Sequence, residues 1–124
     1  ELFMIAPATA STIARLAAGI CDDPVTLVAS ALPSKLPVLL APAMNAQMWG
    51  NPVTQRNVAT LKELLDYHTV GPDEGWLACR TEGAGRMCET EAILEAALGL
   101  VSHAACHSSV ATSEQLAQKS PGQG

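Results

Sequence analysis

Two short apolar runs, each followed by a proline, constrain the fold of this 124-residue chain most strongly. The runs are Leu2–Ala6 and Pro37–Ala41, and a proline, Pro7 or Pro42, follows each. Continuous apolar runs of this length are typical of strands that are buried on both faces of a parallel sheet. Because proline lacks the N–H group that a sheet ladder needs, we expect each strand to end at its proline.

Helix signals follow each predicted strand. After the first run, Thr9 or Ser11 can cap a helix that stops at Gly19. Asp23 stands directly before Pro24, an arrangement that favours a further short helix over Val25–Leu32. The first half of the chain is therefore predicted to form a strand, two helices and a second strand.

The second half continues the alternation. A helix is expected to begin at Asn51-Pro52, a third strand to cover Tyr67–Val70, and a last helix to cover Glu89–Leu100. The apolar positions of the first of these helices recur at helical spacing and are expected to point inward: Val53, Val58, Leu61, Leu64 and Leu65. The alternation predicts an α/β fold with a doubly wound, flavodoxin/Rossmann-like parallel sheet.

Composition excludes several classes of function. The net charge is −5 with only 7 basic residues, which argues against binding to nucleic acid or to an anionic membrane. The four cysteines form no CxxC pair, so we expect reduced thiols in a cytoplasmic protein. His103, Cys106 and His107 form a small cluster without a carboxylate motif, and we assign no metal to it.

The loops after the first two strands are expected to face one crevice, because ligands of open parallel sheets bind outside the carboxyl ends of the strands. The first loop offers a hydroxyl, Thr9, and the free N–H groups of a helix N-terminus, which suit a phosphate or the polar side of a flavin. On the residues alone, helix capping is the better explanation of Thr9 and Ser11.

The second loop carries Asn45 in the run Pro42–Trp49. Its amide offers a donor and an acceptor in fixed geometry, able to orient a carboxylate or an amide of a substrate. Met44, Met48 and Trp49 are expected to surround it. The competing interpretation is an asparagine that caps the short helix after Pro42.

A glycine-rich segment, 71–87, has no sustained periodicity, and we interpret it as a flap over the site. Cys79 lies in it beside Arg80, a neighbour that favours the thiolate. Gly85 would act as a hinge and Arg86 would present a cation to an anionic substrate group. A buried free cysteine and a glycine-rich turn with a solvated arginine are the alternatives.

Three blocks of the sequence, taken together, resemble the flavin-dependent cysteine decarboxylases, among them those that act on phosphopantothenoylcysteine in coenzyme A synthesis. The blocks are Ala6–Thr12 with Gly19–Asp23 behind it, Pro42–Pro52, and Gly71–Met87. The resemblance implies FMN-dependent decarboxylation of phosphopantothenoylcysteine to phosphopantetheine. The hard electron chemistry would belong to the flavin, while the protein supplies orientation and protons.

The resemblance also implies a role for each matching residue. Asn45 and Cys79 would be catalytic, with Cys79 helping to reduce the decarboxylated product. FMN would lie against Pro7, Ala8, Thr9, Ala10 and Ser11, and the substrate against Asn45, Met44, Met48, Arg86 and Gly85. The chain departs from the family pattern at Ser11, where asparagine is usual, and at Arg80 and Thr81, where glycine and aspartate are usual.

Residues 1–102 match the C-terminal portion of the flavoprotein domain in this resemblance, without its N-terminal strands and histidine, and residues 103–124 are expected to be a disordered tail or linker. Members of the family imply a homotrimer or higher oligomer for the complete protein. Two alternatives remain: a decarboxylase acting on the C-terminal cysteine of a peptide, as in lantibiotic processing, and a non-catalytic flavoprotein-like binding subunit.

Overall fold

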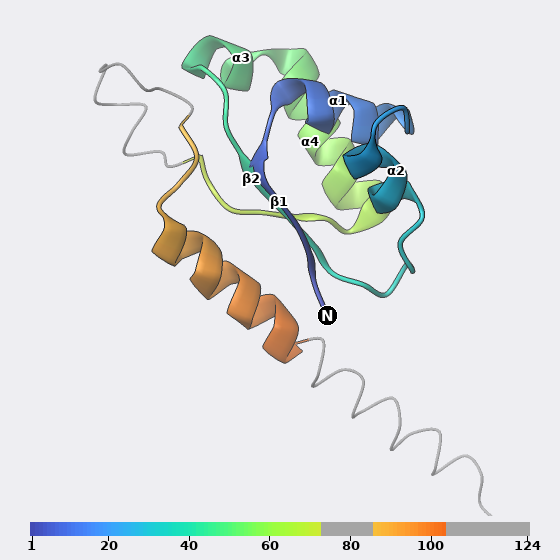
Figure 1. Ribbon diagram of the computed structural model, residues 1–124. Coiled ribbons are helices and arrows are strands. Elements are labelled where there is room, and N and C mark those ends of the chain that lie inside the picture. The colour runs from blue at the N-terminus through green and yellow to red at the C-terminus, as the bar shows by residue number, and fades with distance from the viewer. Residues whose placement is uncertain (73–85, 104–124) are drawn as a thin grey trace, which may run out of the picture.

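A computed structural model describes residues 1–72 and 86–103 of the chain (Figure 1). The elements in chain order are β1 (Phe3–Ala8), α1 (Ala10–Ala18), α2 (Pro24–Ser30), β2 (Val38–Pro42), α3 (Ala46–Gly50), α4 (Pro52–Leu65) and β3 (His68–Thr69). Residues 90–103 are also helical. The predicted alternation of strands and helices is confirmed, and the last helix runs a few residues beyond the predicted end at Leu100.

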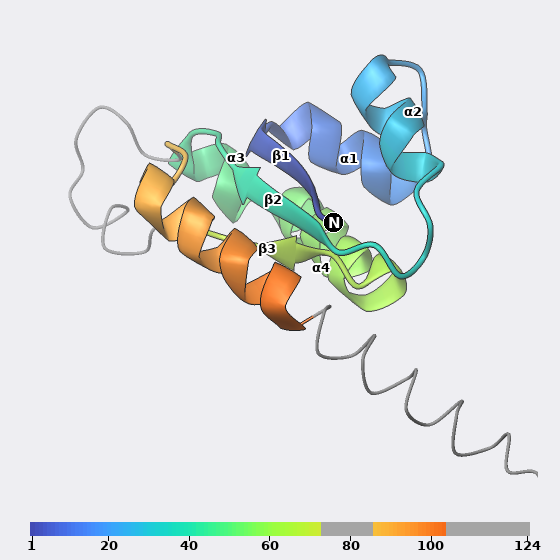
Figure 2. The ribbon, with the colours of Figure 1, turned by 60° about the horizontal axis from the view of Figure 1, so that its bottom comes forward.

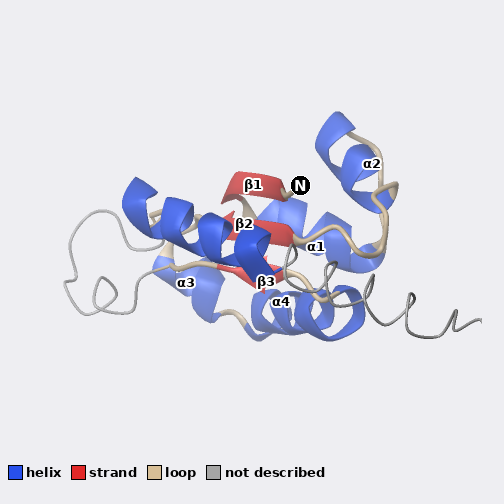
Figure 3. Ribbon diagram, turned by 90° about the horizontal axis from the view of Figure 1, so that it is seen from below, coloured by secondary structure: helices blue, strands red, loops and turns tan. Residues whose placement is uncertain are grey.

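The three strands form a parallel sheet in the order β1-β2-β3. In register, Ile5 lies opposite Leu40, and Leu40 lies opposite Thr69. Helices cover both faces: α1 and α4 lie on one face, and helix 90–103 lies on the other (Figures 2 and 3). The sheet is therefore doubly wound, as the sequence predicts.

The expectation that each strand ends at its proline is wrong for Pro7 and confirmed for Pro42. β1 continues through Pro7 to Ala8, and β2 includes Pro42. Pro7 fits because the register of the β1–β2 ladder is irregular between Ile5 and Ala8, so that no regular ladder N–H is needed at that position. Pro42 is the last residue of β2, where its missing donor interrupts nothing.

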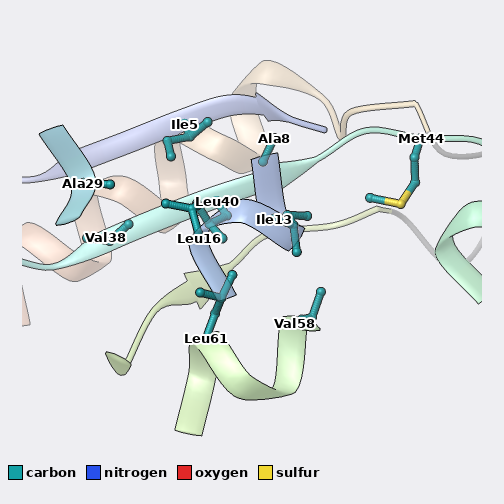
Figure 4. Packing of buried hydrophobic residues seen from close by; sticks show 10 residues of the cluster. All are labelled: Ile5, Ala8, Ile13, Leu16, Ala29, Val38, Leu40, Met44, Val58 and Leu61. Carbon is teal, nitrogen blue, oxygen red and sulfur yellow. The ribbon is translucent and has the colours of Figure 1, made fainter. Parts of the chain in front are cut away.

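Two apolar clusters fill the layers. The larger one lies between the sheet and the α1/α4 layer (Figure 4) and consists of Ile5, Ala8, Ile13, Leu16, Ala29, Val38, Leu40, Met44, Val58 and Leu61. The smaller one joins the opposite face of the sheet to helix 90–103 through Leu39, Ala41, Ile93 and Ala97. Because β2 contributes buried residues to both clusters, it is the central strand of the described sheet.

Helix caps explain where the helices begin and end. Thr9 caps α1, and Gly19 ends it in the left-handed conformation with φ +75°. Asp23 caps α2 through a reciprocal pair of bonds with Thr26, and Asn51 caps α4. These starts agree with the sequence signals, although α2 ends at Ser30, two residues before the predicted end.

The prediction that all five apolar positions of α4 point inward is wrong. Val58 and Leu61 are buried, whereas Val53, Leu64 and Leu65 are 53%, 77% and 48% exposed. At 3.6 residues per turn the five positions spread over about 140° of the helix surface. α1 packs against the part that carries Val58 and Leu61. Val53 and Leu64 lie to one side of that part, whereas Leu65 lies on the same side as Val58 and Leu61 but at the last residue of α4.

Candidate functional site

The loops that follow β1 and β2 are joined at the carboxyl edge of the sheet. The N–H of Ala43 donates to the carbonyl oxygen of Ala8 over 3.0 Å, and Ala8 lies opposite Pro42 in the ladder. This bond continues the sheet beyond its last regular pair and holds the start of α1 beside the segment that leads to Asn45. The expected juxtaposition of the two loops is present.

The start of α1 presents polar groups at this edge. The Thr9 hydroxyl oxygen accepts a hydrogen bond from the N–H of Thr12 over 3.2 Å and so caps the helix. The other N–H groups of the first turn have no intrahelical acceptor, as at any helix start. Of the five residues predicted to contact a cofactor, Pro7, Thr9 and Ser11 are exposed, Ala10 is half-buried and Ala8 is fully buried.

Arg15 is a site candidate that the sequence reasoning missed. Its Nε donates to the Ser11 hydroxyl over 3.2 Å, and its guanidinium forms an ion pair with Asp22. The hydrogen bond that Arg15 donates to the Asp22 carboxylate raises the pKa of Arg15 above its ordinary value. The contact between Arg15 and Ser11 could have been predicted from their four-residue spacing, which places both side chains on one face of a helix. Ser11 is thereby held by a cation on one side.

Asn45 combines the two roles that the sequence offered as alternatives. Its Oδ1 accepts a hydrogen bond from the N–H of Met48 over 2.8 Å and caps α3. The amide oxygen is therefore already engaged in capping. The exposed Nδ2 group of Asn45 has no partner in the part of the chain that the structure describes, so it remains available as a donor.

The apolar neighbours of Asn45 divide into core and surface. Met44 is 9% exposed and belongs to the larger cluster, at the end of that cluster in Figure 4. Met48 is 45% exposed on α3. Trp49 packs partly against the larger cluster, and its carbonyl oxygen accepts a hydrogen bond from the Gln55 side chain. Of the two methionines, only Met48 offers substantial surface to a ligand.

The segment before helix 90–103 returns to the sheet near β3. The Cys88 thiol lies 3.6 Å from the carbonyl oxygen of Val70, and Met87 packs against the smaller cluster. Arg86 is exposed next to them. Cys79 and Gly85 lie outside the described residues, so the predicted flap chemistry is not placed. Within residues 1–72 and 86–103, no group of three or more potential metal ligands comes together.

A pocket of about 460 Å³ lies at the other edge of the sheet. It is lined by the last turns of α1 and α4 together with α2, and it reaches Val38 and Tyr67 at the amino ends of β2 and β3. Burial raises the pKa of Tyr67 above its ordinary value. Since ligands of open parallel sheets bind at the carboxyl edge, the joined loops are the better candidate site.

Comparison with known families agrees with this geometry. A family model described as Flavoprotein matches residues 1–102. The chain belongs to the Flavoprotein family.

A probable phosphopantothenoylcysteine decarboxylase from Streptococcus mutans is 44% identical over 95 residues, which cover 77% of this chain and 52% of that protein. Among solved structures, the FMN-binding protein AtHal3 superposes with a TM-score of 0.70 at 36% identity, covering 77% of this chain and 51% of the other. A phosphopantothenoylcysteine decarboxylase mutant complexed with pantothenoylaminoethenethiol superposes with a TM-score of 0.69 at 35% identity, covering 77% and 52%. The chain thus spans about half the length of these relatives.

Helices long and apolar enough to cross a bilayer do not occur in the described ranges.

Proposed function

We propose that this chain forms part of an FMN-dependent decarboxylase that converts phosphopantothenoylcysteine to phosphopantetheine in coenzyme A biosynthesis. The observation that carries the proposal is the Ala8–Ala43 hydrogen bond, which holds an exposed helix N-terminus next to the Asn45 loop. Family membership and the names of the relatives support the choice of reaction. Both loops lie where parallel sheets bind their ligands.

The residues at the start of α1 suit FMN. The side chains of Pro7, Ala8 and Ala10 are small and lack charge, so a planar ring could approach the backbone there. The first-turn N–H groups of α1 can donate to ring or phosphate oxygens. When bound, FMN would take up two electrons from the substrate thiol, which makes loss of carbon dioxide possible, and would return them to the decarboxylated product.

Asn45 would orient the substrate. Because its Oδ1 is held by the N–H of Met48, the direction of its Nδ2 group is fixed before any ligand arrives. A fixed amide donor suits the carboxylate that is to be lost. Met48, exposed on the first turn of α3, would contact the body of the substrate, while Met44 would support the loop from the core.

The flap residues complete the proposal. Cys79 would donate the proton that the decarboxylated product requires, since a thiol can both donate a proton and be held close by a loop. Arg86 would bind the substrate phosphate, and Gly85 would let the flap close. The support for these three roles is their position in the sequence and, for Arg86, its exposure.

We also propose a domain placement, an oligomeric state and a cellular location for the protein. Residues 1–102 would form the C-terminal portion of a decarboxylase domain that assembles as a homotrimer or higher oligomer in the cytoplasm. The finding that the chain spans about half of its relatives supports the first part of this proposal.

A chimera tests the proposed reaction. Residues 1–102 would replace the matched stretch of the Streptococcus mutans relative, and carbon dioxide release would be followed with phosphopantothenoylcysteine and with a peptide that ends in cysteine. We expect FMN retention and turnover of phosphopantothenoylcysteine. Turnover of the peptide alone would favour the peptidyl-cysteine decarboxylase, and a folded chimera that retains no FMN would favour a binding subunit.

A further inference from the structure

The pocket of about 460 Å³ at the amino edge of the sheet has no role in the proposed decarboxylation. Its volume falls within the range of about 300–1,000 Å³ that is usual for small-molecule sites. The last turns of α1, α2 and α4 line it, together with Val38 and Tyr67 at the amino ends of β2 and β3. The loops assigned to FMN and substrate lie at the opposite edge, so the pocket is a separate candidate site.

Exposed apolar side chains gather around this pocket. Ile20, Leu64 and Leu65 line it, although Ile20 and Leu65 are 48% exposed and Leu64 is 77% exposed. Leu16 and Val38 also line it and are buried members of the larger cluster. A ligand with an apolar body would therefore extend the larger cluster outward and cover the exposed side chains.

The charge of the pocket is negative. Among the described residues that line it, Asp66 is the only charged one. Lys35 and Lys62 lie nearby in the sequence but are exposed and do not line the pocket. Within residues 1–72 and 86–103, no hydrogen bond or ion pair engages the Asp66 carboxylate. This carboxylate is therefore available to a positively charged group.

Three helix ends strengthen the negative potential. The last carbonyl groups of an α-helix have no intrahelical partner, and the C-terminus of a helix carries a partial negative charge. The cap at Gly19 engages the carbonyl oxygens of Arg15 and Leu16, and the cap at Asp66 engages that of Leu61. The later carbonyl groups of α1 and α4 are not engaged by these caps, so they can accept hydrogen bonds from a ligand.

Tyr67 adds a hydroxyl group to the lining. Its side chain is half-buried and packs against the larger cluster. In the part of the chain that the structure describes, no residue forms a hydrogen bond with this hydroxyl. Buried tyrosine hydroxyls usually have a hydrogen-bond partner, and a ligand in the pocket would supply one.

We propose that this pocket, which we call the amino-edge pocket, binds a small amine with an apolar body. The ammonium group would lie near Asp66 and the helix ends, and the apolar body would contact Leu64 and Leu65. An anion of the same shape would be repelled by the carboxylate and by the helix ends. This inference goes beyond the proposed decarboxylation and does not depend on it.

Two probes that share a ring and differ in charge test the proposal. The full chain would be titrated, without FMN, with tryptamine and with indole-3-propionate while its amide resonances are followed by NMR. We expect tryptamine to bind at about millimolar concentration and to shift Gly19 and Tyr67, and indole-3-propionate to bind at least about tenfold more weakly. Equal binding of the two probes, no binding of tryptamine, or shifts confined to residues 9–12 and 45–48 would overturn the proposal.

A matched pair of variants on α4 tests the charge. Asp66→Asn removes the carboxylate and keeps a residue that tolerates the left-handed conformation of this position, φ +55°. Glu63→Gln removes an exposed carboxylate outside the lining. We expect Asp66→Asn to raise the dissociation constant of tryptamine about threefold to fivefold and Glu63→Gln to raise it less than about 1.5-fold. Equal effects would overturn the role of Asp66.

A second pair tests the apolar contact. Leu64→Ala shortens a lining side chain, whereas Leu27→Ala shortens one that is 56% exposed on α2 and lies outside the lining. Both side chains are largely exposed, so both variants should fold, as circular dichroism would check. We expect Leu64→Ala to weaken tryptamine binding about twofold or more and Leu27→Ala to leave it unchanged. Equal effects, or competition between tryptamine and FMN, would overturn the location of the site.

Discussion

Asn45 shows how one side chain can serve both the fold and a ligand. Its Oδ1 caps α3, and its Nδ2 is free to donate in the described structure. Aspartate keeps the acceptor and loses the donor, whereas alanine loses both. We expect Asn45→Ala to lower the free energy of unfolding by about 1 kcal/mol and Asn45→Asp to lower it much less. Denaturant titration of both variants would check this.

The same two variants test ligand binding in the chimera. If the Nδ2 group orients the substrate carboxylate, both should lose decarboxylation, and Asn45→Asp should do so while keeping its stability. A fully active Asn45→Asp chimera would show that Asn45 serves only as a cap.

Asp23 should make stability depend on pH. Hydrogen bonds from Thr26, the backbone N–H first, hold its pKa below the ordinary value of 3.8. A lowered pKa in the folded state stabilises the protein above the unfolded value, and this stabilisation is lost as pH falls through the folded value. The free energy of unfolding should therefore decrease from about pH 5 to below about pH 3.

Asp23→Asn is the matched control, because asparagine caps a helix without titrating in this range. The difference in unfolding free energy between the parent chain and this variant should shrink as the pH is lowered. A difference that stays constant with pH would contradict the role assigned to the Asp23 carboxylate.

At the scale of elements, two glycines should respond to alanine in opposite ways. Gly19 ends α1 at φ +75°, a conformation that strains any L side chain, while Gly99 lies within helix 90–103 with open space around its Cα. We expect Gly19→Ala to destabilise the protein by about 1 kcal/mol or more and Gly99→Ala to stabilise it by up to about 1 kcal/mol. Thermal unfolding of both variants would measure these changes. Stability changes of the same sign would contradict the role of Gly19 as the C-cap of α1.

Two leucines of α4, Leu61 and Leu64, test which side of the helix packs in the core. Leu61 is fully buried, whereas Leu64 is 77% exposed. Leu61→Ala should cost about 2–5 kcal/mol of unfolding free energy, and Leu64→Ala less than about 0.5 kcal/mol. Similar losses at both sites, measured by denaturant titration, would mean that Leu64 is covered in solution.

Helix starts were predictable because their signals are local. Thr9, Asp23 and Asn51 each cap the helix that the sequence assigned to them. Which apolar positions are buried could not be predicted in the same way. Leu64 follows the helical pattern as well as Leu61 does, but its burial depends on what packs against α4. The prediction that β1 ends at Pro7 is wrong for a related reason, because the irregular β1–β2 ladder accepts Pro7.

At the scale of the whole molecule, the topology of the sheet creates the site. Parallel strands bring the loops after β1 and β2 to one edge, so the pairing of the Thr9 and Asn45 loops could be predicted from the order of elements alone. The ion pair of Arg15 with Asp22 could not be predicted, because it depends on a chain turn after Gly19 that composition does not reveal.

The topology of the sheet also leaves β1 at an edge of the described sheet. The described sheet is buried where helices cover both faces and exposed where they do not, and the change occurs between Leu39 and Met4. The cofactor measurement should therefore be made on a protein in which that boundary is covered.

The most direct test of the central claim is a visible absorbance titration of the chimera with FMN, followed by addition of phosphopantothenoylcysteine under anaerobic conditions. We predict that FMN is retained after gel filtration and that carbon dioxide is released when the substrate is added. Retained FMN without carbon dioxide release, in a chimera whose folding is intact, would contradict the assignment of this chain to a phosphopantothenoylcysteine decarboxylase.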